Sequence, residues 1–283
     1  MAKLILCAAK IGAGVRHRYI MLSQVKAYAD RYGYRVRMLW GATGGVADHR
    51  HEELFAPIPG IDIQNISKHQ LRSIADLCAR DGGFVYHGEP FHVARSDRGY
   101  SERFFSWDLA GSEDLSMRVP RPIPQLVATP SAPIQADIRA WVGANRVHTR
   151  LGIRVRAIEQ LHRTNRVHRI KAELDAALQA LYRIPWYVPV FIVTDSEYIQ
   201  QRLASHFADS VFIPKKFEDA EAGGRYVRRS DKDAMKTFIK EIGCLCACKK
   251  IISNGGFLND ASVEAKIIRA PYREAAYMNA AIA

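Results

Sequence analysis

The chain has 283 residues, 48% of them hydrophobic, which is typical of a globular protein with one large domain or two of ordinary size. Extensive disorder is therefore excluded. The formal charge of +12 favours an anionic partner, such as nucleic acid, a membrane surface or a phosphorylated small molecule. Because the 41 lysines and arginines are spread along the chain without a long basic tail, nucleic acid is not the leading expectation.

The first segment is predicted to form a strand, a glycine turn and a helix. An apolar run from Leu4 to Ala8 leads into Gly12-Ala13-Gly14-Val15-Arg16, and helical spacing follows from Tyr19 to Tyr32. Such a turn lets backbone N–H groups approach a phosphate, and Arg16 adds a positive charge. A merely tight turn is an equal alternative, because the third glycine of the dinucleotide pattern is absent. Arg35 to Trp40 alternates as a second strand and completes a βαβ unit.

The middle of the chain contains a charged segment and then a proline-rich one. In the segment from Asp48 to Glu53, His49 and His51 do not have the spacing of metal ligands on a helix, so a solvated helix start is predicted. The prolines between Val119 and Pro133 prevent regular helix and indicate a connection. Helical patterning resumes at Ile134, and we place the boundary near Asn145, which gives domains 1–145 and 146–283.

A pair of arginines follows this boundary in Gly152-Ile153-Arg154-Val155-Arg156. In an extended strand Ile153 and Val155 share one face, so the guanidinium groups of Arg154 and Arg156 both project from the other face. The run 190–193 is predicted to be a buried strand of an α/β sheet, in which ligands collect beyond the carboxyl ends of strands. Arginine binds an anion with two parallel hydrogen bonds, so the pair predicts phosphate recognition. A pair of exposed strand arginines is the alternative.

The C-terminal half is predicted to alternate strands and helices. An amphipathic helix from Glu197 to Phe207 opens after Asp195 and Ser196, both near its N-cap. Lys250 to Ser253 is a strand that runs into a second glycine turn. Two α/β units, each with a glycine turn, predict two Rossmann-like domains. The remaining elements are a strand at 211–214, a basic loop at 223–229 and a helix at 230–248.

Three of the five cysteines, Cys244, Cys246 and Cys248, alternate within the predicted helix, unlike the paired C-x-x-C of zinc sites. They are predicted to be small buried residues rather than metal ligands. Free thiols indicate a reducing compartment, and the first apolar run is too short to span a membrane. These features predict a cytoplasmic location without a transmembrane segment, and they leave peripheral membrane contact open.

The order of these motifs resembles the GDP-fucose-dependent fucosyltransferases of GT-B fold, in the group of the nodulation-factor and core alpha-1,6-fucosyltransferases. The resemblance spans most of the chain. It rests on four segments: Gly12-Ala13-Gly14-Val15-Arg16 with Trp40 following, Gly152 to Arg156, Phe191 to Ser196 with the helix behind it, and Cys248 to Phe257.

The resemblance implies two Rossmann-like domains facing a cleft, the first on the acceptor side and the second on the donor side. It implies an inverting, metal-independent transfer of fucose from GDP-fucose to a hydroxyl of a glycan or other small acceptor, with no cofactor. Arg156 matches the family's arginine and is expected to clamp the departing diphosphate, with Arg154, at the position of the family's His, as a second cation. Glu159, nearest the family's acid, and Asp48 are the candidate general bases.

The donor-binding residues expected from the resemblance come from both halves of the chain. They are Gly12, Gly14, Arg16, Thr194, Asp195, Ser196, Arg225, Tyr226, Ser253, Asn254, Gly255, Gly256 and Phe257.

Three other classes of function stay open. A dinucleotide-dependent oxidoreductase would need a full G-x-G-x-x-G and an acid at the end of the second strand, where this chain has Trp40. A basic nucleic-acid-binding protein would use the +12 charge. A degenerate transferase that binds a nucleotide without turnover is favoured by Arg154 at the family's His position.

Overall fold

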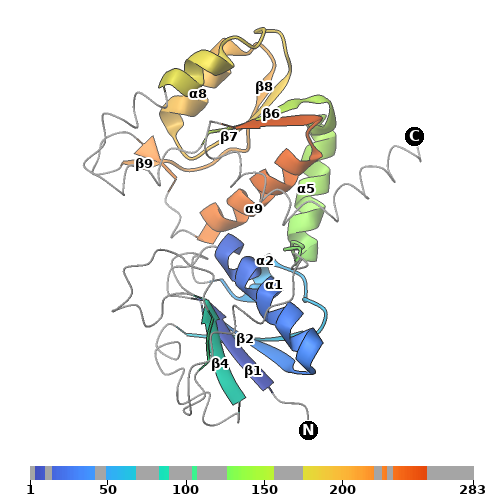
Figure 1. The fold of residues 1–283 in the computed structure, drawn as a ribbon. Helices are drawn as coiled ribbons and strands as arrows, with labels where there is room; N and C mark the ends of the chain where they lie inside the picture. Colours follow the sequence, from blue (N-terminus) through green and yellow to red (C-terminus); the bar gives the residue numbers. More distant parts are fainter. Residues whose placement is uncertain are drawn as a thin grey trace. The chain divides into compact units, whose positions relative to one another are not determined.

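The computed structural model describes residues 4–9, 15–41, 49–67, 83–88, 104–106, 126–155, 175–219, 225–227 and 232–253. The chain divides into two compact units, Met1–Ser131 and Ala132–Ala283, and each is built on a parallel sheet with helices (Figure 1). The predicted α/β class is confirmed.

The division falls before helix α5 (Ala132–Ala144), whereas the sequence analysis placed it after this helix. The reason is that α5 packs against α9 (Lys232–Ala247) of the second unit. A Cβ atom added to Gly243 of α9 would come within 2.5 Å of the Ile138 side chain of α5. Lys240 also pairs with Asp137 across the two helices, at 3.2 Å.

The first unit contains a five-stranded sheet in the order β3-β2-β1-β4-β5, in which β5 alone is antiparallel to its neighbour. Helix α1 (Val15–Tyr32) connects β1 to β2 and buries Leu22 and Val25. The predicted βαβ unit is confirmed, and the helix begins early enough to place Arg16 in its first turn. The strands are β1 (Leu4–Ala9), β2 (Arg35–Gly41), β3 (Ile61–Ile66), β4 (Gly83–Gly88) and β5 (Phe104–Ser106).

The second unit contains a four-stranded parallel sheet in the order β11-β6-β7-β8. Counted within the unit, this is the order 3-2-1-4 read from the other edge, which is also the order of β3-β2-β1-β4 in the first unit and of a Rossmann half. The strands are β6 (Leu151–Val155), β7 (Val190–Thr194), β8 (Ser210–Val211) and β11 (Lys250–Ser253). The shorter elements are η2 (Val147–Thr149) and the antiparallel pair of β9 (Glu218–Asp219) with β10 (Arg225–Tyr226).

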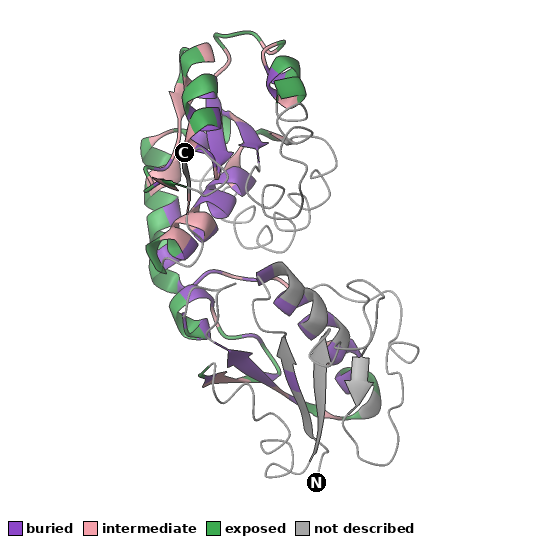
Figure 2. Ribbon diagram, turned by 90° about the vertical axis from the view of Figure 1, so that its left-hand side faces the viewer, coloured by how far each residue is buried: buried purple, intermediate pink, exposed green. Residues whose placement is uncertain are grey.

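Helices cover both faces of the second sheet. On one face, Ile153 and Val155 of β6 pack against Ile199 and Leu203 of α8 (Glu197–His206) and against the helical residues 175–181. On the other face lie α5 and α9, where a Cβ atom on Gly152 would come within 2.6 Å of Leu245. All residues of β7 are buried, as the apolar run predicted (Figure 2).

The prediction of buried cysteines is confirmed for Cys244 and Cys246, whereas Cys248, just after α9, is half-buried. Cys244 and Cys246 lie buried in α9 as free thiols. Burial raises the pKa of the Cys244 thiol to about 12, so the reactive thiolate is suppressed. No helix in the described part of the chain is long and apolar enough to cross a bilayer.

Candidate functional site

The carboxyl edge of the second sheet collects several of the predicted donor-site residues. The parallel register pairs Arg154 of β6 with Val193 of β7 and with Ser253 of β11, and it pairs Val155 with Thr194. Three neighbouring strands therefore end at the same level. β6 is also where the strand order reverses, since the chain leaves it toward β7 on one side and returns to β11 on the other. Ligands of open α/β sheets bind at such a switch point.

Arg154 lies on the face of β6 opposite the apolar pair Ile153 and Val155, as predicted. It is 5% exposed, so the alternative of an exposed strand arginine is wrong for this residue. Its positive charge acts on the Glu241 carboxylate of α9. A buried guanidinium at a strand end, with a carboxylate nearby, is an oriented cation rather than a solvated one.

Two neighbouring residues at the end of β7 have different roles: Ser196 caps a helix, and Asp195 is a candidate ligand-binding residue. Ser196 is the N-cap of α8, and its Oγ accepts from the backbone N of Ile199 at 3.5 Å. Thr194 Oγ1 accepts from the backbone N of Ser196 at 3.2 Å. Capping therefore accounts for Ser196 and not for Asp195, which is half-buried.

Asp195 also ties a second segment to this edge. Its backbone carbonyl accepts a hydrogen bond from the backbone N of Val227 at 3.0 Å. Val227 directly follows Arg225 and Tyr226 of β10, so these two predicted donor-site residues belong to a segment that is fixed beside the end of β7.

A buried ion pair, which the sequence analysis did not predict, supports this edge. Lys215 Nζ donates to the Thr194 carbonyl at 2.5 Å and to the Glu241 carboxylate, and both side chains are buried. Burial raises the pKa of Glu241, while the charges of Lys215 and Arg154 oppose the rise and that of Asp195 adds to it. The pair links the chain after β8 to α9 and holds the backbone next to Asp195.

The structure brings together Arg154, Thr194, Asp195, Ser196, Arg225, Tyr226 and Ser253 in the second unit. Arg16 belongs to α1 of the first unit. The remaining predicted positions lie outside the described residues: Gly12, Gly14, Asp48, Arg156, Glu159, Asn254, Gly255, Gly256 and Phe257.

In the first unit, the prediction of a solvated helix start is wrong for the two histidines, which are buried, while Arg50, Glu52 and Glu53 beside them are exposed. His49 and His51 are 1% and 3% exposed, and the ring of His51, in the short helix α2 (His51–Leu54), packs against the aromatic rings of Trp40 and Phe55. Trp40 Nε1 donates to the His49 carbonyl at 3.0 Å. Arg18 of α1 stacks over the Trp40 ring at 4.5 Å.

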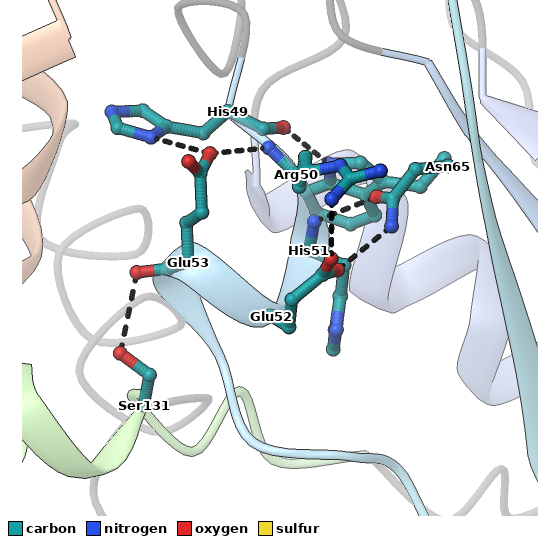
Figure 3. Close-up of polar contacts among 8 residues, drawn as sticks. His49, Arg50, His51, Glu52, Glu53, Asn65 and Ser131 are labelled. Atoms are coloured by element: carbon teal, nitrogen blue, oxygen red, sulfur yellow. Dashed lines mark hydrogen bonds and ion pairs between the residues drawn. The ribbon is translucent and has the colours of Figure 1, made fainter.

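Polar contacts fix α2 from several sides (Figure 3). Glu53 Oε2 accepts from the backbone N of Arg50 at 2.7 Å and lies 3.1 Å from His49 Nδ1. Asn65, at the end of β3, accepts from the backbone N of His51 and donates to Glu52. Burial lowers the pKa of His51 to about 4, so its imidazole is neutral near pH 7.

No group of three or more His, Cys, Asp or Glu is placed to hold a metal ion among the described residues. A D-x-D spacing does occur at 231–233, where Asp233 lies in the first turn of α9 and complements the helix dipole.

Comparison with known proteins finds a match of fold. A crystal structure of NodZ alpha-1,6-fucosyltransferase soaked with GDP-fucose matches at TM-score 0.51 and 14% identity, over 95% of this chain and 93% of that chain. A crystal structure of Se-Met fucosyltransferase NodZ from Bradyrhizobium matches with the same values. No protein-family model and no curated protein matches. The resemblance drawn from the sequence is thus confirmed for the fold.

The Lys215–Glu241 pair gives a stability prediction. Lys215→Met leaves a buried carboxylate without its cation and should lower the free energy of unfolding by about 3–5 kcal/mol. The double variant Lys215→Met/Glu241→Leu removes both charges and should recover most of this loss. Denaturant unfolding measures both.

The adjacent Lys240→Met is the matched control, because its pair with Asp137 is more exposed and should contribute at most about 1 kcal/mol. Equal losses in the Lys215 and Lys240 variants would contradict the assignment.

His51 gives a pH prediction. Its folded pKa is lowered, so the unfolded chain binds a proton that the folded chain does not, and stability should fall as the pH drops from about 6.5 to about 4. The loss attributable to His51 is about 3 kcal/mol. His51→Gln should flatten this part of the profile in denaturant unfolding, while His148→Gln, which removes an exposed imidazole, should keep the wild-type slope.

Proposed function

We propose that this protein is a GT-B glycosyltransferase that transfers fucose from GDP-fucose to a hydroxyl of a glycan or other small acceptor, without a metal ion. One observation carries the proposal. Buried Arg154 of β6, Asp195 at the end of β7 and Ser253 at the end of β11 lie at the switch point of a Rossmann-like sheet. The fold likeness to NodZ, whose structures include one soaked with GDP-fucose, supports the same conclusion.

The chemistry requires cations beside the donor diphosphate. The acceptor oxygen attacks the anomeric carbon from the side opposite the diphosphate, the glycosidic bond breaks with inversion, and the diphosphate leaves with the bonding electrons. A general base takes the acceptor proton. Arg156 is assigned as the diphosphate clamp and Arg154 as the second cation, since developing negative charge is stabilised by groups oriented in advance. Glu159 and Asp48 are the candidate bases.

The nucleoside end of the donor is assigned to the end of β7. The Asp195 carboxylate can accept hydrogen bonds from a guanine edge or from ribose hydroxyls, next to the backbone held by Lys215. Thr194, Ser196, Arg225 and Tyr226 surround this position in the chain or in the fold. The turn from Ser253 to Phe257 is assigned to the phosphates through its backbone N–H groups.

The second unit is therefore proposed as the donor domain and the first as the acceptor domain, and Gly12, Gly14 and Arg16 of the first glycine turn are also assigned to donor binding. Free buried thiols such as Cys7 and Cys244 agree with a cytoplasmic location.

A nucleotide-binding protein without turnover is the second candidate, because Arg154 stands where the related enzymes have His. The oxidoreductase alternative is disfavoured by the end of β2. There Trp40 is fully buried and covered by Arg18, so this position offers no carboxylate to a ribose.

The first test is a thermal-shift panel with GDP, GDP-fucose, UDP and NAD in the presence of a chelator. A ligand that binds the folded state raises the apparent melting temperature according to RT ln(1 + [L]/Kd). We expect GDP and GDP-fucose to stabilise the protein more than UDP or NAD. Equal responses to UDP and GDP, or a strict need for Mg²⁺, would count against the proposal.

Substitutions of Asp195 and Ser196 should affect different properties, nucleotide binding in one case and stability in the other. Asp195→Ala should weaken GDP binding by about 10- to 100-fold, the cost of a hydrogen bond to a charged group, with little change in melting temperature. Ser196→Ala should instead remove the cap of α8 and lower stability by about 1 kcal/mol. Calorimetric titration with GDP and thermal unfolding measure the two effects, and an Asp195 variant with wild-type affinity would remove Asp195 from the site.

Arg156→Lys should lower turnover much more than donor affinity. Lysine keeps the charge but loses the two-pronged geometry, and the clamp acts on charge that grows in the transition state. The expected loss is about a hundred- to a thousand-fold in kcat. Arg154→His, which restores the residue of the related enzymes, should be tolerated. A folded Arg156→Lys protein with wild-type turnover in a transferase assay would refute the clamp.

A further inference from the structure

The loop before β7 presents an uncharged tip at the amino edge of the second sheet. Residues 184–189, Ile-Pro-Trp-Tyr-Val-Pro, are an unbroken run of apolar or aromatic side chains. Trp186 is 61% exposed and Tyr187 is 66% exposed. Exposing two neighbouring large rings is unfavourable in water, and such exposed apolar side chains often mark an interaction site.

The tip is held in place by its backbone. Val188 N donates to the Pro185 carbonyl at 3.0 Å, and Ala208 N donates to the Trp186 carbonyl at 3.0 Å. Leu151 N of β6 donates to the Pro189 carbonyl, also at 3.0 Å. Prolines at 185 and 189 restrict the chain further. The two rings pack edge to face with centroids 6.0 Å apart, so they project from the surface together.

Several cations lie at the same sheet edge as this tip. The parallel sheet places the chain entering β11 and β6 at the same edge as the loop, because neighbouring strands lie about 4.8 Å apart and begin together. Lys249 and Lys250 precede or open β11, Arg146 precedes β6 and Arg183 precedes the tip, and all four are exposed. The carboxylate of Asp209 at this edge is paired with Arg150 at 2.6 Å. The rim is therefore positive.

We propose that this surface, the aromatic tip 184–189 with its basic rim, docks the protein on a bilayer that contains anionic phospholipids. Trp and Tyr favour the boundary between headgroups and acyl chains, where an apolar body and a polar ring atom are both satisfied. Lysines and arginines next to such a tip meet the lipid phosphates. The contact is peripheral and independent of donor binding, which is assigned to the opposite edge of the same sheet.

The arrangement fits a membrane better than a nucleic acid. Single-stranded nucleic acid binds along a basic groove whose aromatic faces are open for base stacking. Here Trp186 and Tyr187 pack against each other at an uncharged tip, and the cations lie around the tip rather than between the rings. An apolar centre with a positive rim matches a surface with an apolar interior and negative headgroups.

Vesicle co-sedimentation tests the proposal with the full-length protein. The vesicles are phosphatidylcholine alone or phosphatidylcholine with phosphatidylserine, at low and high NaCl. We expect binding only to the anionic vesicles, weakened by salt. Trp186→Ser/Tyr187→Ser should abolish it, and Lys249→Gln/Lys250→Gln should weaken it roughly thirtyfold, from the attraction of two lysines to an anionic leaflet.

Tyr198→Ser is the matched control. This tyrosine is 54% exposed but opens α8 at the carboxyl edge of the sheet, so its loss should leave vesicle binding unchanged. All variants change exposed side chains, and unchanged melting temperature and GDP response would show that each is folded. Absence of binding by the wild type, equal binding by the tip variant, or binding of a labelled oligonucleotide that the tip variant abolishes would each overturn the proposal.

Discussion

The placement of β6 between β7 and β11 is the constraint on which the rest of the second unit depends. Parallel pairing on both sides forces the three strands to end together, so Arg154, Thr194 and Ser253 meet although they are far apart in the chain. The same pairing requires close contact of α9 with the sheet at Gly152, where a side chain has no room. α9 in turn carries Glu241 toward Arg154 and Lys215. One pairing pattern thus positions both the cation and its counter-charges.

Much of this architecture could be predicted from local sequence, for identifiable reasons. The buried β7 has an uninterrupted apolar run, and β6 alternates between apolar residues and arginine. The pattern of each strand therefore predicts which of its faces are buried. α8 has a serine cap and a clear apolar face. β8 was predicted as 211–214 but spans Ser210–Val211, and Pro214, which has no N–H to give to a neighbouring strand, lies outside it. The domain boundary differs because the partner of α5 lies about a hundred residues away in the chain.

What local sequence could not predict is the pairing of buried charges. Lys215 and Glu241 stand in segments that also carry exposed charges, such as Lys216 and Lys236, and no periodicity marks them as different. Only the approach of α9 to the end of β7 makes each the partner of the other. The histidines after β2 are a similar case. His49 and His51 belong to a charged stretch, but both are buried, and His51 packs against the rings of Trp40 and Phe55. Trp40 could have indicated this burial, because a large aromatic residue at a strand end is buried only if the residues that follow pack over it.

The two edges of the second sheet differ in chemistry because strand direction separates them. The carboxyl edge gathers the buried Arg154 next to Asp195 and the buried Lys215–Glu241 pair, so its charged groups are held in place by one another. The amino edge gathers exposed cations around two exposed rings, a combination that selects a charged surface and requires no pocket. In the proposed function, a donor bound at one edge and a bilayer at the other do not compete for the same side chains.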